Sequence, residues 1–183
     1  MTGIWANMSA AALGREIGGG RIHPVELTEA FLERIDNHPL SPRIYARATA
    51  VRARGEAMAA ATRAKSGFRR GLLDGVPISW KDLFDTAGVA TEAGSALLKG
   101  RTPDRDATVL ATATLQGLVC LGKTHMSELA FSGLGLNPVT ATPPCLNDDR
   151  AVPGGSSSGA AASVAFGLAP AAIGSDTGGS IRI

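Results

Sequence analysis

The first third of the chain repeats its hydrophobic residues at the spacing of an α-helix. Leu27, Phe31 and Ile35 recur four positions apart after Pro24, and this spacing places them on one face of a helix. Proline suits the first helical turn, where its missing N–H has no partner to lose. We therefore expect the helix to begin at Pro24 and to end before Pro39. Similar reasoning predicts two more helices, at 10–17 behind a Ser9 cap and at 48–65.

From residue 72 onward, β-branched and aromatic residues replace much of the alanine. Val76, Ile78 and Trp80 alternate with other residues, which predicts a strand over 76–80 with Lys81 at its end. Further strands are expected at 44–46, 118–121 and 168–173. Helices are expected from a cap at Asp104 or Asp106 to residue 116, at 126–131 and at 158–167, with a loop over 132–153. Strands that alternate with helices imply an α/β fold, with a mixed, largely parallel central sheet flanked by helices.

The length of the chain favours one domain. With 183 residues it can bury one good core, and neither a repeat nor a shift in composition marks a second. We expect a single domain over 1–183, with a helical N-terminal layer at 1–68 and the α/β part at 69–183. Because the chain stops three residues after Ser180, inside a glycine-rich loop, we also expect it to be a fragment of a longer domain.

Composition and charge narrow the class of protein. The formal net charge is +2 and the arginines are scattered, which favours neither nucleic acid nor an acidic membrane surface as a partner. No apolar stretch approaches the roughly 20 residues that span a bilayer, and the N-terminus lacks the pattern of a secretory signal. Cys120 and Cys145 are too few for a disulfide framework. These features fit a globular protein of the reducing cytoplasm, with a buried thiol at Cys120.

Two clusters of glycine and serine near the end of the chain carry the candidate chemistry. Residues 153–159 read Pro-Gly-Gly-Ser-Ser-Ser-Gly, and residues 174–182 read Gly-Ser-Asp-Thr-Gly-Gly-Ser-Ile-Arg. Glycine lets backbone N–H groups approach a ligand closely. Serine offers a nucleophile, so the two clusters suit acyl transfer, which needs a nucleophile and fixed donors for an oxyanion.

One simpler match is the Gly-x-Ser-x-Gly elbow of α/β-hydrolases, which residues 155–159 fit with Ser157 at the centre. That mechanism needs an acid and then a histidine later in the chain. His125 is the last histidine and precedes the cluster. The elbow interpretation therefore requires residues beyond Ile183.

A second match is a phosphate-binding loop, whose spacing residues 117–124 satisfy with Lys123 and Thr124 in the required places. Such a loop must follow a strand and keep its amides free for the nucleotide. Residues 118–121 are themselves a predicted strand, which would use those amides in the sheet. We interpret Lys123 as a strand-end residue.

A lysine is the remaining candidate for a base. Where histidine is unavailable, a neutral lysine can activate a serine hydroxyl. Lys65 and Lys99 lie at a predicted helix end and in a polar turn, whereas Lys81 follows an apolar strand. Burial at that position would lower the pKa of Lys81. A serine between Lys81 and the nucleophile could carry the proton across.

Taken together, these residues resemble the amidase signature family. The two glycine–serine clusters look like its signature block, and residues 75–82, Gly-Val-Pro-Ile-Ser-Trp-Lys-Asp, resemble its lysine motif. Shorter similar segments are 85–88, 93–97, 122–124 and 128–130. The resemblance implies an amidase-signature fold of which only the N-terminal part is present here, since members of the family run to well over twice this length.

The resemblance implies a Ser–cis-Ser–Lys triad. By motif position Ser180 is the acylated nucleophile, Ser156 is the bridging serine in a cis peptide after Gly155, and Lys81 is the base. The oxyanion hole consists of the backbone amides of Thr177, Gly178, Gly179 and Ser180. The implied reaction is hydrolysis of the C–N bond of a small-molecule carboxamide through an acyl-enzyme, with no metal or organic cofactor. Residues 69–183 are then the catalytic part of the domain.

Two alternatives stay open at this stage. Within the family, the chain could be the amidase subunit of a glutamyl-tRNA(Gln) or aspartyl-tRNA(Asn) amidotransferase, which would act beside partner subunits. From another class, it could be a non-catalytic fragment or a binding module whose glycine loops are only structural. A homodimer is compatible with each of these interpretations.

Overall fold

The computed structural model describes residues 2–183 and contains a four-stranded sheet in the order β1-β3-β2-β4. The strands are β1 (Tyr45–Ala48), β2 (Pro77–Lys81), β3 (Val119–Thr124) and β4 (Ala172–Ile173). β2 lies parallel to both of its neighbours, β3 and β4, and β1 is antiparallel to β3. The prediction of a mixed, largely parallel sheet is confirmed.

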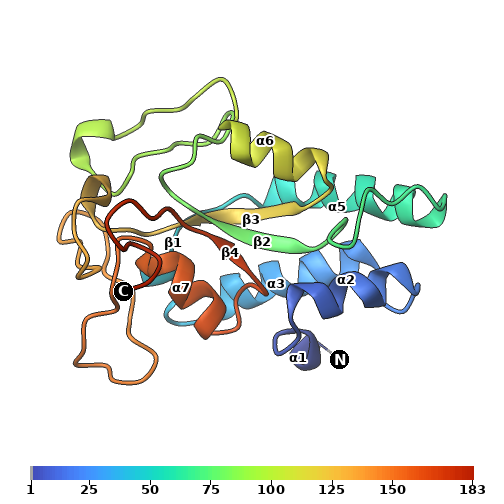
Figure 1. Cartoon of the computed structure of the whole chain (residues 1–183), viewed down its shortest axis with the longest axis horizontal. Helices are drawn as coiled ribbons and strands as arrows, with labels where there is room; N and C mark the ends of the chain where they lie inside the picture. Colours follow the sequence, from blue (N-terminus) through green and yellow to red (C-terminus); the bar gives the residue numbers. More distant parts are fainter. Residues whose placement is uncertain (1) are drawn as a thin grey trace.

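Helices cover both faces of this sheet. They are α1 (Thr2–Trp5), α2 (Ala10–Gly18), α3 (Pro24–Asn37), α4 (Ser41–Ile44), α5 (Ala50–Lys65), α6 (Thr108–Leu115) and α7 (Ser158–Ala165). Two 3-10 turns, η1 (Ala96–Leu98) and η2 (Glu128–Ala130), lie in the connecting segments. Figure 1 shows α6 on one side of the sheet and α2, α3 and α7 along the other. α5 packs against α3 and β3.

The core lies at the two middle strands, because every residue of β2 and β3 is buried. Ile78 and Trp80 of β2 join Phe31 and Leu27 of α3 in one hydrophobic cluster. Burying a large apolar side chain contributes about 1.5–3 kcal/mol, so these contacts fix β2 firmly at the centre of the sheet. Lys81 is the last residue of this strand.

The pairing of β2 with β3 shifts by one residue between Ile78 and Ser79. Beyond this irregularity Trp80 lies opposite Lys123, and Lys81 lies opposite Thr124. The unpaired residue is Leu121 of β3, so it is the following side chains of β3 that change faces relative to β2.

The N-terminal helices follow the predicted pattern closely. Ser9 caps α2, since its Oγ accepts a hydrogen bond from the Ala12 N–H at 3.2 Å. α3 begins at Pro24 and ends at Asn37, as its hydrophobic spacing predicts. β1 begins one residue and ends two residues later than the expected 44–46, and α5 begins at Ala50 rather than at residue 48.

The predicted cap of α6 is wrong. The helix begins at Thr108 behind Ala107, without a side-chain cap. Asp106 instead accepts two hydrogen bonds from the Arg52 guanidinium, at 2.7 and 2.8 Å, and one from the Ala87 N–H. A carboxylate engaged by a fixed arginine is not available to a helix end.

Two other predictions are wrong in extent. Residues 126–131 form only the short turn η2, in which Leu129 and Ala130 take positive φ angles of 50° and 61°. The strand expected at 168–173 shrinks to β4, because the N–H groups of Leu168 and Ala169 donate to the Ser163 carbonyl at the end of α7. β3, by contrast, extends beyond the predicted residue 121 to Thr124.

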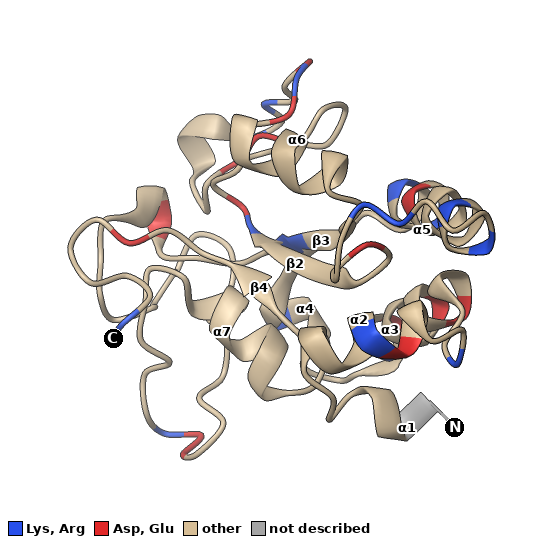
Figure 2. Ribbon diagram, turned by 45° about the vertical axis from the view of Figure 1, so that its right-hand side comes forward, with Lys and Arg blue, Asp and Glu red and all other residues tan. Residues whose placement is uncertain are grey.

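Charged side chains lie mainly on the outer helices and in the loops, whereas α7 carries none (Figure 2). No helix among residues 2–183 is both long enough and apolar enough to cross a membrane.

Candidate active site

Lys81 lies at the carboxyl end of β2 and is completely shielded from solvent. Its Nζ is 2.6 Å from Ser156 Oγ, 2.8 Å from Ser175 Oγ and 3.1 Å from Ser157 Oγ. The serines come from the two glycine–serine clusters, so the lysine joins both of them. The structure thus brings Lys81 and Ser156 into contact.

The surroundings of Lys81 favour a neutral amine. Burial lowers the pKa of Lys81 to about 8, and the nearby carboxylate of Asp176 opposes this shift in part. Desolvation disfavours the charged form of a lysine, which is the effect expected for an ammonium at the end of an apolar strand. Near neutral pH a fraction of Lys81 is therefore a neutral amine.

The loop before α7 presents Ser156 and Ser157. The Gly155-Ser156 peptide bond is cis, as the resemblance implies, and both serines are buried. Glycine is needed at 159 because a Cβ there would lie 2.5 Å from the His125 carbonyl oxygen and 2.7 Å from that of Ile44. The second glycine of the elbow-like pattern thus serves the close approach of α7 to the neighbouring backbone.

Ser157 ties the two clusters to each other. Its Oγ donates to the Ser175 carbonyl at 3.1 Å and accepts from the Ser175 N–H at 3.2 Å. With Lys81 as a further neighbour, the hydroxyl is fully occupied. Ser157 therefore supports the arrangement of the two clusters, and its hydroxyl is not free to act as an elbow nucleophile.

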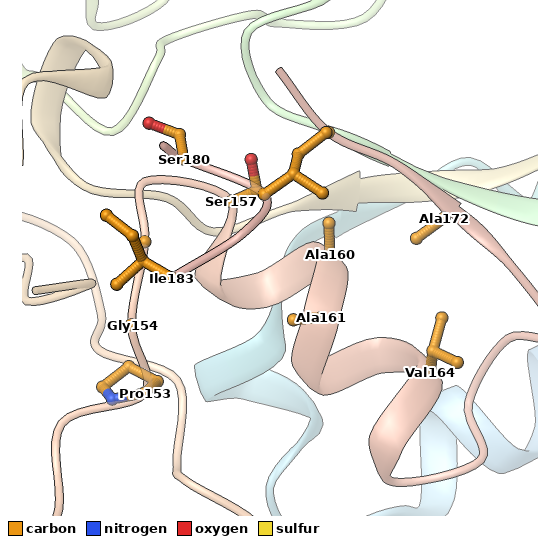
Figure 3. A pocket seen from close by; sticks show the side chains of 12 residues that line it. Pro153, Gly154, Ser157, Ala160, Ala161, Val164, Ala172, Ser180 and Ile183 are labelled. Carbon is orange, nitrogen blue, oxygen red and sulfur yellow. The ribbon is translucent and has the colours of Figure 1, made fainter. Parts of the chain in front are cut away.

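Ser180 lies beside Ser157, and its carbonyl accepts a hydrogen bond from the Ser157 N–H at 3.2 Å. Its hydroxyl points away from Ser157 in Figure 3. Within residues 2–183, no hydrogen bond joins the hydroxyls of Ser156 and Ser180. The structure places the three predicted residues in one region but closes only the contact between Lys81 and Ser156.

Ser157 and Ser180 line a cavity of about 150 Å³. Its walls are mainly apolar and come from α7, β4 and the last turn, including Ala160, Val164 and Ile181. Figure 3 shows both serines at one end of this cavity and Val164 at the other. The space can hold a small apolar group next to the two hydroxyls.

The turn before Ser180 is organised by Asp176. Its carboxylate accepts from the Gly179 N–H at 2.8 Å and pairs with the Arg182 guanidinium at 2.8 and 3.1 Å. The hydrogen bond from Arg182 is the main reason that the pKa of Asp176 is lowered to about 2. Among the four predicted oxyanion-hole amides, Gly179 is thus engaged within the chain. The N–H groups of Thr177, Gly178 and Ser180 make no hydrogen bond to residues 2–183.

Lys123 does not form a phosphate-binding loop. It lies in β3, is completely buried, and its Nζ is 3.1 Å from Asp82 Oδ1 and 2.8 Å from Thr91 Oγ1. The Arg47 guanidinium lies 2.9 Å from the same Asp82 carboxylate oxygen, and it also lies 2.6 Å from the carboxylate of Glu92. Lys123 thus lies next to the end of its strand, as predicted, but its ammonium is held inside the protein within this buried group of charges.

Ser175 is the site residue that sequence reasoning missed. It lies in the second cluster, where Ser180 occupies the signature position, and no pattern distinguishes its hydroxyl from that of a turn residue. Residues 2–183 contain no group of three or more histidine, cysteine or acidic side chains placed to hold a metal ion. Cys120 is buried, as predicted, and both cysteines are free.

The fold and the site define an amidase-type protein, and the chain belongs to the amidase family, whose sequence model, Amidase, matches residues 26–183. It is 42% identical to the A subunit of glutamyl-tRNA(Gln) amidotransferase from Marinobacter nauticus, over 96% of this chain and 37% of that protein. It is 47% identical to the protein of the same name from Anaeromyxobacter dehalogenans, over 92% of this chain and 35% of that protein.

Solved structures give the same family and the same fold. The native peptide amidase from Stenotrophomonas maltophilia matches with a TM-score of 0.87 and 34% identity, over 96% of this chain and 37% of that chain. An amidase family protein from Bacillus anthracis matches with a TM-score of 0.87 and 30% identity, over 98% of this chain and 37% of that chain. The chain thus spans little more than a third of the length of these relatives.

Proposed function

We propose that this chain carries the catalytic residues of an amidase that cleaves the C–N bond of a carboxamide. Ser180 is the nucleophile, Ser156 is the bridging serine and Lys81 is the base. The observation that carries the proposal is the contact of 2.6 Å between Lys81 Nζ and Ser156 Oγ, in a place where no solvent reaches either side chain. A lysine held there can be neutral and can accept a proton.

The proton moves along the three residues in order. Neutral Lys81 takes the proton of Ser156, and Ser156 takes the proton of Ser180 as Ser180 Oγ attacks the amide carbon. When the C–N bond breaks, the leaving nitrogen receives a proton back along the same route, and a seryl ester remains. Water then attacks this acyl-enzyme with Lys81 and Ser156 again acting as the base.

The oxyanion requires backbone donors near Ser180. The amides of Thr177, Gly178 and Ser180 have no partner within residues 2–183 and are available to it. We assign Gly179 a supporting role instead, because its N–H bonds Asp176. Removing one such donor typically costs about 3 kcal/mol of transition-state stabilisation.

Substrate binding in this proposal involves a rotation of one hydroxyl and the filling of the cavity. The Ser180 hydroxyl rotates toward Ser156, with which it makes no hydrogen bond among the described residues 2–183. A small apolar part of the amide enters the cavity beside Val164 and Ile181.

We assign a small-molecule amide as the substrate. We assign the cytoplasm as the location, and the two free cysteines support this location.

A fluorophosphonate tests the nucleophile directly. We expect the 183-residue chain to gain one phosphonyl group by intact mass, and peptide mapping to place it on Ser180. Ser180→Ala abolishes this labelling, whereas Ser66→Ala, at an exposed helix end, leaves it unchanged. Failure of the wild-type chain to react, or labelling that persists in Ser180→Ala, contradicts the assignment. Such failure together with a cooperative melt favours a non-catalytic module.

The relatives support a second candidate function. The two curated relatives from Marinobacter and Anaeromyxobacter are both named as the A subunit of glutamyl-tRNA(Gln) amidotransferase, so the chain is alternatively part of such a subunit. That role predicts release of ammonia from glutamine only in the presence of partner subunits. Hydrolysis of plain amides by the protein alone, at a higher rate than that of glutamine, contradicts it and supports the amidase.

A further inference from the structure

Three hydroxyl groups surround the Lys81 amine, from Ser156, Ser175 and Ser157. A charged ammonium has three N–H donors and no acceptor, whereas a neutral amine has two N–H donors and one lone pair. Three accepting hydroxyls thus match the ammonium. When Lys81 is neutral, one hydroxyl must turn and donate its own proton to the lone pair.

Ser157 cannot be that donor. Its single proton is directed to the Ser175 carbonyl, 3.1 Å away, and its oxygen accepts from the Ser175 N–H. Ser157 therefore accepts from Lys81 in both protonation states. The choice of donor lies between Ser156 and Ser175, whose hydroxyls each have Lys81 as their only hydrogen-bond partner within residues 2–183.

We propose that Ser175 is a positioning residue that accepts the second N–H of neutral Lys81 and so leaves the lone pair to the proton of Ser156. This assignment rests on the proposed function. If Ser175 donated instead, the lone pair would be occupied and Lys81 could not receive a proton from Ser156. With Ser157 and Ser175 both accepting, Ser156 is the only one of the three hydroxyls aligned to give its proton to the base.

The same acceptor stabilises the product of the proton transfer. When Lys81 gains the proton of Ser156, its three N–H groups face Ser156, Ser157 and Ser175, and all three oxygens can accept. Loss of the Ser175 hydroxyl leaves the ammonium with an unpaired donor in a buried place, where an unmade hydrogen bond to a charged group is costly. Replacing Ser175 by alanine thus disfavours the protonated form of Lys81.

Few other charges act on Lys81. Asp176, on the turn after β4, is the charged group that raises its pKa. On the neighbouring β3, Lys123 is paired with Asp82, and α7 has no titratable side chain. Ser175→Ala changes none of these charges, so its effect on the pH dependence reports the hydroxyl.

The test compares variants in amide hydrolysis across pH. Wild type is expected to gain kcat/KM as pH rises toward about 8, where Lys81 loses its proton. We expect Ser175→Ala to lower kcat about 10-fold to 100-fold with little change in KM. The acidic limb of kcat/KM should move about one pH unit lower. Ser175→Thr keeps the hydroxyl and should restore both quantities toward wild type, whereas Ser175→Cys, with a weak acceptor, should follow the alanine variant.

Ser163→Ala is the matched control, since Ser163 is a buried serine of α7 whose hydroxyl bonds the Ala160 carbonyl. It should leave the acidic limb in place. A Ser175→Ala variant with wild-type kcat and an unmoved limb overturns the role of Ser175, provided that Lys81→Met and Ser180→Ala are inactive. Activity retained by Lys81→Met or Ser180→Ala overturns the proposed function instead, so the two failures are distinguishable.

Discussion

Lys81 and Ser156 are 75 positions apart in the chain, yet Lys81 Nζ lies 2.6 Å from Ser156 Oγ. The lysine belongs to the central strand β2, which is paired on both sides, and the serine belongs to the loop before α7. A rigid strand therefore holds the lysine, and a glycine-rich loop brings the hydroxyl to it.

Replacing Lys81 by methionine should abolish amide hydrolysis. The apolar stem is retained but the base is lost, so we expect kcat/KM to fall about 1,000-fold or more. Steady-state kinetics and thermal melting measure activity and folding separately. Lys99→Met, at an exposed position in a turn, serves as the control and should behave as wild type. A Lys81→Met variant that retains a tenth of the activity would place the base elsewhere.

The same substitution makes a prediction about stability that does not depend on catalysis. The pKa of Lys81 is about 8 in the folded chain, against 10.5 for an unperturbed lysine. Between these values the unfolded chain binds more protons than the folded one, so the stability of wild type rises with pH over this window. Relative to Lys81→Met, wild type should gain about 3 kcal/mol between pH 8 and pH 10.5. Urea denaturation of both proteins at several pH values measures this difference, and a constant difference would show that burial does not depress the pKa.

Lys123→Met should destabilise the fold. It removes the ammonium from a buried carboxylate, Asp82, and we expect a loss of about 3 kcal/mol in the free energy of unfolding. The control is Arg54→Ala, which breaks the ion pair with Glu29, about half exposed on each side, and should cost less than about 1 kcal/mol. Urea denaturation at one pH compares the two. Equal losses in the free energy of unfolding would mean that the buried ion pair stabilises the fold no more than the exposed one.

Asp176→Ala should impair catalysis while the fold stays intact. The carboxylate holds the Gly179 N–H and Arg182, and so shapes the turn that presents Ser180. We expect kcat to fall about 10-fold or more, with an intermediate value for Asp176→Asn, which keeps one acceptor oxygen. The acidic limb should also shift to lower pH, because Asp176 raises the pKa of Lys81. Asp148→Ala, which breaks a similar local pair with Arg150, should change neither quantity.

Local pattern was sufficient to predict the elements whose structure is decided locally. α3 begins at Pro24 and ends at Asn37 because both its apolar stripe and its starting residue lie in the sequence itself. The cap of α6 could not be predicted, because Asp106 is taken by Arg52, a residue of another helix. The short strand β4 likewise depends on the Ser163 carbonyl of α7, which accepts the N–H groups of Leu168 and Ala169.

The residues of the site also differ in whether the sequence alone reveals them. Lys81 and Ser156 stand in motifs that a single sequence displays, and the structure brings these two side chains together. Ser175 could not be recognised, because its role depends on a contact with Lys81 across 94 positions of the chain. The engagement of the Gly179 N–H could not be predicted from a motif either, because only the folded turn shows that the Asp176 carboxylate accepts its hydrogen bond.

The register shift in the β2–β3 ladder leaves one residue of β3, Leu121, without a partner in β2, because Ile78 lies opposite Cys120 and Ser79 lies opposite Gly122. Successive side chains of a strand point to opposite faces, so the residues of β3 after Leu121 change faces relative to β2. Lys123 thereby lies opposite Trp80 and reaches Asp82, while Lys81 meets the serines. Without the extra residue, Lys123 would lie opposite Lys81 and on the same face, and Asp82 would lose this ammonium. A single backbone irregularity thus keeps two buried lysines on opposite faces of the sheet.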